Sequence, residues 1–301
     1  MARSTPLGVH VQSYIDAVPG ATESAKVDNF TRGCEMMKAS AVSSVFVHQF
    51  PHALSGFDDY ANAAERSGLQ HGGALGLDSS AISPEDKGDA IADVATRRNS
   101  LGCLADSESH FDPGRRDEMR RMGAQARKGA PDALIVAQPW PEPNEHGQFP
   151  YEEEDAFCDA DAPQYYVNDW IKQYGRARYA KLLPVFDAQW TKLRATVLAK
   201  YDRAFVPTWQ GRAWDDIPAD CGEVVITRPS LIVWCEPFPS TLFLRQCRAR
   251  AFLAARGFIK PDWTDATTAV LRFQQDYNKT ATTKLTEDGR CGLLTLSAMG
   301  V

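Results

Sequence analysis

Short apolar runs alternate with amphipathic segments along the first 240 residues of the chain. The runs are rich in Val, Ile, Phe and Trp and predict eight strands, most of which are followed by stretches with helical spacing. The predicted strands span 6–14, 42–50, 70–78, 100–106, 132–140, 164–170, 203–210 and 230–236. Strands that alternate with helices favour a parallel sheet, and eight such units in this length favour a (β/α)8 TIM-type barrel. A doubly wound sheet is the alternative, but a Gly-rich phosphate loop does not follow the first strand.

Helical segments between the runs carry start signals and charged faces. Helices are predicted over 24–40, from Phe57 to Gly68, from Ser83, over 114–129 and up to about Lys200. Ser83-Pro84 has the form of an N-cap followed by a proline in the first helical turn. Residues 114–129 are strongly basic on one side. Residues 142–161 hold eight acids and are too irregular for a clean helix, and we expect a solvated lid over 152–161, with a cation site as the alternative.

The stretch from Leu101 to Phe111 begins apolar and ends in acids. Side chains alternate along a strand, so Asp106 and Glu108 point the same way, about 7 Å apart along the chain. Repulsion between two such carboxyls raises at least one pKa, which suits a general acid near neutral pH. The alternative interpretation is a solvated loop whose acids cap the helix that begins near Asp112.

Other acids and tryptophans also follow the predicted strands. In a barrel the active site lies at the carboxyl ends of the strands. Carboxylates hydrogen-bond sugar hydroxyls and run acid–base cleavage, and tryptophan rings stack on pyranose faces. The predicted catalytic residues are Glu108, Asp106, Asp169 and Glu236, and the predicted substrate-binding residues are His48, Trp140, Glu142, Trp209 and Asp78. The alternatives are lid packing for the tryptophans, a buried ion pair for Glu236 and an interior position for His48.

Composition and charge narrow the class of protein. The chain has 301 residues, enough for one large and one small domain. Residues 241–301 carry nine basic and five acidic side chains, a net charge of +4, which leaves −10 on residues 1–240. This basic footprint is too small for a nucleic-acid role. Neither a membrane span nor a secretory signal is visible, and we expect neither a metal nor a cofactor, because the cysteines and histidines lack ligand spacing.

The first part of the chain resembles glycoside hydrolases of families 25 and 18. Gly102-Cys-Leu-Ala-Asp106-Ser-Glu108 resembles the end of the family 18 signature, and the passage from Val45 to Ala74 resembles the second and third barrel units of family 25 muramidases. Both families place Asp-x-Glu at the end of the fourth strand with the Glu as proton donor. The resemblance therefore implies that Glu108 is the acid. Family 25 has an Asp at the end of the first strand, where this chain has His10-Val-Gln12.

The role of Asp106 follows from the chemistry of N-acetyl sugars. Their 2-acetamido group can itself attack the anomeric carbon, and a neighbouring carboxylate then orients it. Asp106 suits this role, or that of raising the pKa of Glu108. Asp169 or Glu236 is the alternative base or nucleophile.

Residues 241–301 resemble the three-helix peptidoglycan-binding module found beside wall hydrolases. The resemblance is carried by the segments 250–258, 268–274 and 285–295. Val270, Phe273 and Tyr277 form one helix face there, and Asp288-Gly289 forms a tight turn. We expect a barrel domain over 1–240 and the module over 241–301. Both need the predicted helix at 240–256, so we expect them to share or directly abut it.

These features predict a peptidoglycan hydrolase of the lysozyme, muramidase or glucosaminidase type, such as a phage endolysin. It would be made in the cytoplasm without a signal peptide and act at the bacterial cell wall after release. The expected partner is peptidoglycan, without nucleic acid or membrane, and the expected state is a monomer. Two alternatives stay open: a wall amidase or peptidase on the same barrel, and a non-catalytic wall-binding or virion protein.

Overall fold

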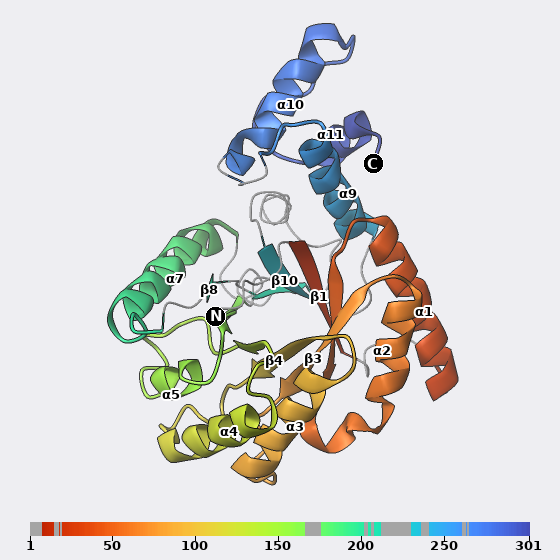
Figure 1. Cartoon of the computed structure of the whole chain (residues 1–301). Helices are drawn as coiled ribbons and strands as arrows, with labels where there is room; N and C mark the ends of the chain where they lie inside the picture. The colour runs from red at the N-terminus through yellow and green to blue at the C-terminus, as the bar shows by residue number, and fades with distance from the viewer. Residues whose placement is uncertain are drawn as a thin grey trace.

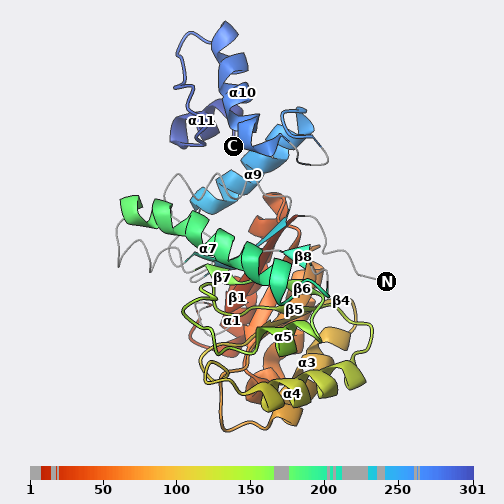
Figure 2. The same cartoon turned by 90° about the vertical axis from the view of Figure 1, so that its left-hand side faces the viewer.

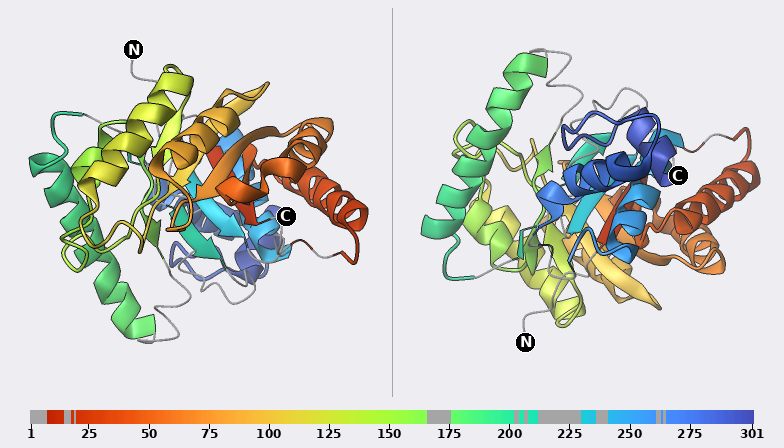
Figure 3. Two further views of the ribbon diagram at one scale, coloured as in Figure 1. Left: turned by 90° about the horizontal axis from the view of Figure 1, so that it is seen from below. Right: turned by 90° about the horizontal axis from the view of Figure 1, so that it is seen from above.

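The chain has an α/β fold in which helices surround a curled, parallel sheet (Figure 1, Figure 3). The computed structural model describes residues 8–14, 18, 20–165, 176–201, 204–205, 208–211, 230–235, 241–260, 263 and 265–301. The strands are β1 (Gly8–Tyr14), β2 (Ser44–Gln49), β3 (Gln70–Gly76), β4 (Ser100–Asp106), β5 (Ile135–Ala137), β6 (Ala160–Asp161), β7 (Gln164–Tyr165), β8 (Ala204–Phe205), β9 (Thr208–Gly211) and β10 (Ser230–Cys235). The helices are α1 (Glu23–Ala39), the 3-10 helix η2 (Pro51–Gly56), α2 (Phe57–Arg66), α3 (Pro84–Thr96), α4 (Arg116–Gly129), α5 (Tyr151–Asp155), α7 (Arg176–Thr196), α9 (Thr241–Ala255), α10 (Ala266–Thr280) and α11 (Leu293–Met299).

The strands pair in the order β7-β9-β10-β1-β2-β3-β4-β5-β6-β8, and every pair is parallel. All eight predicted strands contain observed strand residues, and β4 has its predicted bounds. The sixth predicted strand, 164–170, is described only over its first two residues. Its observed part is β7, and β6 lies four residues earlier, inside the stretch predicted to be a lid. Residues 166–170 lie outside the described ranges.

Helix starts follow the chemistry that the sequence indicated. Ser83 caps α3, since its Oγ accepts a hydrogen bond from the Asp86 amide at 3.1 Å, and Pro84 is the first helical residue. Thr22 caps α1 in the same way, accepting from the Ala25 amide at 3.2 Å. The two caps fix where the chain turns from loop into helix.

Within the described ranges, no helix has the length and apolarity that crossing a bilayer requires.

The two faces of the sheet bury different sets of side chains. Phe46, Ala74, Leu104 and Val136 belong to a cluster that contains no helix residue, so this cluster fills the inside of the curl. The alternate positions Val45, Leu75 and Cys103 belong to a larger cluster shared with the helices, so these side chains face outward. This is the period of two expected of strands buried on both faces.

An extra residue in β4 sets which of its side chains face inward. The register of β3 with β4 runs from His71 opposite Ser100 to Gly73 opposite Cys103, two steps on β3 against three on β4. Gly102 takes up the extra residue at a φ of +138°, a backbone conformation that favours glycine. After this bulge Asp106 lies opposite Gly76.

Gly102→Ala is expected to lower the free energy of unfolding by about 2–5 kcal/mol. A Cβ at this position would lie 2.2 Å from the Leu134 carbonyl oxygen, and the positive φ would add backbone strain. Thermal unfolding measures the loss. Gly147→Ala is the matched control, because a Cβ there would have no heavy atom nearer than 4.0 Å. Equal melting temperatures for the two variants would contradict this role for the bulge.

The expectation of a solvated lid over 152–161 is wrong. Glu154 and Asp155 are each 1% exposed and Asp161 is 2% exposed. The basic side of α4 and one arginine of α7 supply charge to this stretch: Arg116 and Arg120 contact Glu153 at 2.7 and 2.8 Å, Arg127 contacts Asp159 at 2.8 Å, and Arg194 contacts Asp161 at 3.4 Å. Burial raises the pKa of Glu154 well above its usual range, and the negative charges of Asp161, Asp155 and Asp106 raise it further. The acids are therefore part of the packed body.

Helix α9 contributes to two hydrophobic clusters. Phe243 and Leu244 in its first half belong to the large cluster outside the sheet. Ala249 and Leu253 in its second half belong to a separate cluster with α10 and α11. Figures 1 and 2 show α10 and α11 beyond one end of the sheet, connected to it through α9. Helix α9 therefore belongs to both clusters, as a helix shared by two domains would, and the two domains with their division at 240 and 241 stay a prediction.

The C-terminal cluster is organised around one buried amide, that of Gln274, which is 1% exposed. Its Nε2 donates to Asp288 Oδ1 at 3.0 Å and to the Arg290 carbonyl at 3.1 Å, while its Oε1 accepts from the Gly289 amide at 2.9 Å. Gly289 has a φ of +73°, as the predicted Asp288-Gly289 turn requires. Gln274 thus ties α10 to the turn that leads into α11.

Candidate active site

Polar side chains follow the last apolar layer on four strands of the curled sheet. His48, Asp106, Gln138 and Gln164 come two residues after Phe46, Leu104, Val136 and Ala162, all of the inner cluster. The period of two therefore directs these polar side chains to the inside, one layer above the apolar one. Asp106 is 8% exposed and His48 is 2% exposed.

The Asp106 carboxylate lies between side chains from two other strands. Its Oδ2 is 3.2 Å from His48 Nε2, and its Oδ1 accepts a hydrogen bond from Gln164 Nε2 at 2.6 Å. These contacts fix the orientation of the carboxylate inside the curl.

Glu108 is the second carboxyl of this site and lies nearer to solvent. Gln164 Nε2 donates to Glu108 Oε1 at 2.8 Å, so one amide group holds both carboxyls. Burial raises the pKa of Glu108 well above its usual range, and the negative charges of Asp106, Asp78 and Glu142 raise it further. A carboxyl in this environment keeps its proton through neutral pH, as a general acid must.

Gln164 is a residue that the sequence reasoning missed. Its Nε2 also lies 3.0 Å from the Gln138 carbonyl oxygen, and Gln138 Nε2 donates to Gln12 Oε1 at 2.9 Å. The three glutamines link β1, the end of β5 and β7 beneath the carboxyls. The signal that could have found them is their period-two spacing from the apolar layer, because an amide at such a position has to face inward.

Asp78 holds the turn that carries Glu108. Its Oδ1 accepts from the amides of Glu108 at 2.8 Å and His110 at 3.3 Å. Its Oδ2 accepts from the amide and the hydroxyl of Ser109, each at 3.2 Å. The sequence placed Asp78 among the substrate-binding residues, whereas the structure gives both of its oxygens partners within the protein.

Trp140 and Glu142 follow β5 at the same end of the sheet as Asp106 and Glu108. The Trp140 ring stacks on His146, with 4.7 Å between centroids and an interplanar angle of 8°, and His146 Nδ1 is 3.0 Å from Asp112 Oδ2. One face of the indole is therefore covered by protein. Glu142 is partly exposed and lies close enough for its charge to act on Glu108.

The side chains of the three remaining predicted residues are outside the described part of the structure. Asp169 and Glu236 lie outside the described residues, and for Trp209 only the backbone, in β9, is described. The structure thus brings together Asp106, Glu108, His48, Asp78 and Glu142. Among the described residues, no group of three His, Cys, Asp or Glu side chains has a geometry that could hold a metal ion.

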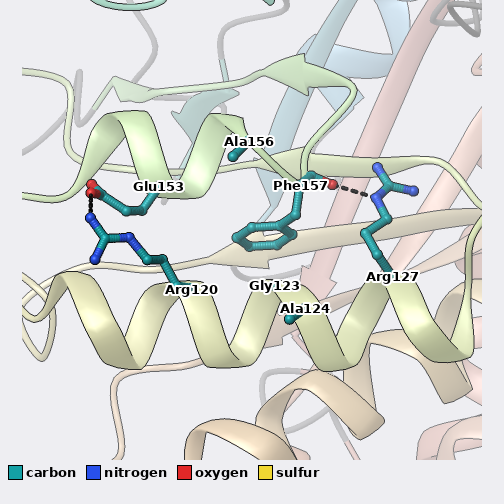
Figure 4. Close-up of a pocket in the computed structure, with 7 residues that line it drawn as sticks. All are labelled: Arg120, Gly123, Ala124, Arg127, Glu153, Ala156 and Phe157. Carbon is teal, nitrogen blue, oxygen red and sulfur yellow. Dashed lines mark hydrogen bonds and ion pairs between the residues drawn. The ribbon is translucent and has the colours of Figure 1, made fainter.

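A separate hollow of about 280 Å³ lies between α4 and α5, away from these carboxyls (Figure 4). Arg120 and Arg127 line it, together with Phe157. Arg120 contacts Glu153 at 2.8 Å, and Arg127 Nε donates to the Phe157 carbonyl oxygen at 2.6 Å. These arginines are thus engaged in joining α4 to the acidic segment.

A scan against models of known protein families finds no match for this chain, and a search of curated proteins finds none either. Solved structures do match. GH5_18 from Streptomyces cattleya, in complex with Manβ1-4GlcNAc, aligns over 98% of this chain and 98% of its own, with a TM-score of 0.54 and 15% identity. The glycoside hydrolase domain of PgaB (BpsB) from Bordetella bronchiseptica aligns over 77% of this chain and 95% of its own, with a TM-score of 0.51 and 12% identity. At these identities the likeness shows the fold alone: this chain shares its curled α/β architecture with glycoside hydrolases.

Proposed function

We propose that the chain is a peptidoglycan hydrolase that cleaves glycosidic bonds of the glycan strand, with Glu108 as the proton donor. One observation carries the proposal: a single amide, that of Gln164, holds the Glu108 and Asp106 carboxyls side by side in surroundings that keep Glu108 protonated. Most glycosidases use two carboxyl groups whose pKa values differ. The fold shared with glycoside hydrolases agrees with this chemistry.

In the proposed reaction the Glu108 proton moves to the glycosidic oxygen as the bond from that oxygen to the anomeric carbon breaks. The carbonyl oxygen of the sugar's own 2-acetamido group bonds to the anomeric carbon on the other side. Asp106 orients that acetamido group. Water then adds to the anomeric carbon, breaks the new bond and returns a proton to Glu108. Asp169 or Glu236 is the alternative base or nucleophile.

The architecture proposed for this function is a complete (β/α)8 barrel. β6 and β7 are two residues apart, as are β8 and β9, and β6 pairs with β8 while β7 pairs with β9. Counting each of these pairs of segments as one interrupted strand gives eight strand positions. β10 pairs with both β9 and β1, which supports closure of the ring.

The helices α9, α10 and α11 are proposed to form the peptidoglycan-binding module. Their separate hydrophobic cluster and the Gln274-centred turn support a unit of its own, joined rigidly through α9. The protein would then act at the bacterial cell wall after release, as phage endolysins do. Trp140, Glu142 and Trp209 would contact the glycan, and the buried His48 would act on it through its contact with Asp106.

Mass spectrometry of material released from purified sacculi tests the reaction. Cleavage of the glycan by the full chain yields muropeptides with new reducing ends, and the sugar at that end identifies the bond. Release of free peptides with intact glycan would instead indicate an amidase or peptidase. If no material is released from the sacculi, the result would favour a wall-binding protein without catalytic activity.

Wall binding is expected to weaken as salt is added, because residues 241–301 carry a net charge of +4 and the wall is anionic. The measurement is co-sedimentation of the full-length Glu108→Gln variant with sacculi, since that variant should leave the wall intact. Retention should be highest at low ionic strength and fall by several-fold near 1 M salt, where charges are screened beyond about 3 Å. A protein that stays in the supernatant at every salt concentration would contradict the proposed anchor.

A further inference from the structure

Three consecutive residues at the proposed proton donor are held by one side chain. Asp78, two residues beyond β3, accepts hydrogen bonds from the amides of residues 108, 109 and 110 and from the Ser109 hydroxyl. Hydrogen bonds to an ionised acceptor contribute more than neutral ones. Four such bonds on one carboxylate fix the backbone from which the Glu108 side chain extends.

We propose that Asp78 is the positioning residue of the acid: its carboxylate fixes the 108–110 turn, from which the Glu108 side chain extends. The proposal rests on the proposed function for the role of Glu108. It assigns Asp78 an effect on the reaction through Glu108 and without contact with the sugar.

The charges around the turn fit this assignment. The acids that act on Glu108 are Asp106 at the end of β4, Asp78 after β3 and Glu142 after β5, and they raise the pKa of Glu108 together with burial. His48 contacts Asp106 from β2. These three charged side chains are acids, so removing one of them should ease the ionisation of Glu108.

A buried lysine on α3 carries a positive charge on which Asp78 acts. Lys87 on α3 is 1% exposed, and its ammonium lies 4.8 Å from the centre of the Phe111 ring, in the same turn region. Burial lowers the pKa of Lys87 to about 8, while Glu118 and Asp78 raise it and Arg115 lowers it. The Lys87 ammonium thus lies on the α3 side of the turn.

Two substitutions separate the two effects of Asp78. Asp78→Asn removes the charge and puts a donor where the turn needs an acceptor. We expect kcat to fall about tenfold or more with little change in KM, and the alkaline limb of the pH–rate profile to move about one unit lower. Asp78→Glu keeps the charge but misplaces it. We expect it to lower kcat and leave the alkaline limb where the native protein has it.

Asp117→Asn is the matched control, because it removes the same charge from a side chain that is 90% exposed and contacts Arg120. We expect the native profile from it. Native kcat and an unmoved limb in Asp78→Asn would overturn the proposal, and so would native kcat in Asp78→Glu. If Asp78→Asn does not fold, Asp78→Glu alone decides.

A titration of the Glu108 carboxyl by ¹³C NMR separates this proposal from the proposed function. The labelled full-length chain reports the Glu108 pKa whether or not the protein cleaves glycan. A lower Glu108 pKa in Asp78→Asn than in Asp117→Asn supports the proposal even if sacculi release no muropeptides. Equal values in the two variants would sink the proposal while leaving the hydrolase function standing.

Discussion

Glu108→Gln is expected to lower the rate of wall lysis by about 10²- to 10⁴-fold, the usual contribution of a general acid. Glutamine has nearly the same shape and can still accept the hydrogen bond from Gln164 Nε2, which Glu108 Oε1 accepts at 2.8 Å. The variant lacks only the proton that Glu108 would give to the glycosidic oxygen. The measurement is the initial rate of turbidity loss of sacculi, with muropeptide release as the second readout.

The rate of wall lysis by the native protein is expected to depend on pH through the Glu108 carboxyl. The pKa of Glu108 is raised, so its protonated form persists through neutral pH and activity is lost only as pH rises through that raised value. The folded protein holds this proton, whereas the unfolded chain releases it above the ordinary value for glutamate. Glu108 therefore destabilises the folded state increasingly as pH rises from that ordinary value towards the raised one.

This linkage supplies the stability control for Glu108→Gln. Because glutamine has no proton to lose, the variant should melt at the native temperature or above it, with a difference that grows with pH. Glu145→Gln, at an exposed position between β5 and α5, should lyse walls at the native rate. A correctly folded Glu108→Gln that lyses walls as fast as the native protein would place the catalytic acid elsewhere.

The sequence predicted the site best where one strand carries it. The change from apolar to acidic residues predicted the bounds of β4. The period of two along a strand predicted that Asp106 and Glu108 point the same way. The bulge at Gly102 was not predictable in the same way. It depends on how β4 pairs with β3, and the strand pattern of β4 alone does not contain that information.

Burial of the acids at 152–161 was missed because it depends on a partner far away in sequence. The basic side of helix 114–129 and the acidic stretch were both visible, but their charges were not matched to each other. Arg116, Arg120 and Arg127 lie against the acids once α4 and α5 pack together. Matching charge runs on consecutive elements could have indicated this contact.

The amide that links the two carboxyls was missed for a related reason. Gln164 was assigned to a strand, but an uncharged side chain does not stand out among acids and tryptophans. Its importance comes from three-dimensional position, because β7 brings its amide within 2.6 Å of Asp106 and 2.8 Å of Glu108. Sequence alone located the carboxyls but not the group between them.

Asp106→Asn is expected to reduce the rate of wall lysis to a degree comparable with Glu108→Gln, about 10²-fold or more. Asp106 Oδ1 accepts from Gln164 Nε2 and Oδ2 lies 3.2 Å from His48 Nε2. Asparagine replaces one of these acceptors with an NH₂ group, which would face an N–H of Gln164 or the His48 ring. The carboxylate that should orient the acetamido group is lost at the same time.

The pH–rate profile of Asp106→Asn separates its two proposed roles. The charge of Asp106 raises the pKa of Glu108, so its removal should move the alkaline limb to lower pH. At acidic pH, where Glu108 is protonated in both proteins, a rate loss that persists measures orientation of the acetamido group. Recovery of the native rate at acidic pH would limit Asp106 to its effect on Glu108. A native rate and an unmoved limb at every pH, in a variant that melts like Asp117→Asn, would exclude Asp106 from the reaction.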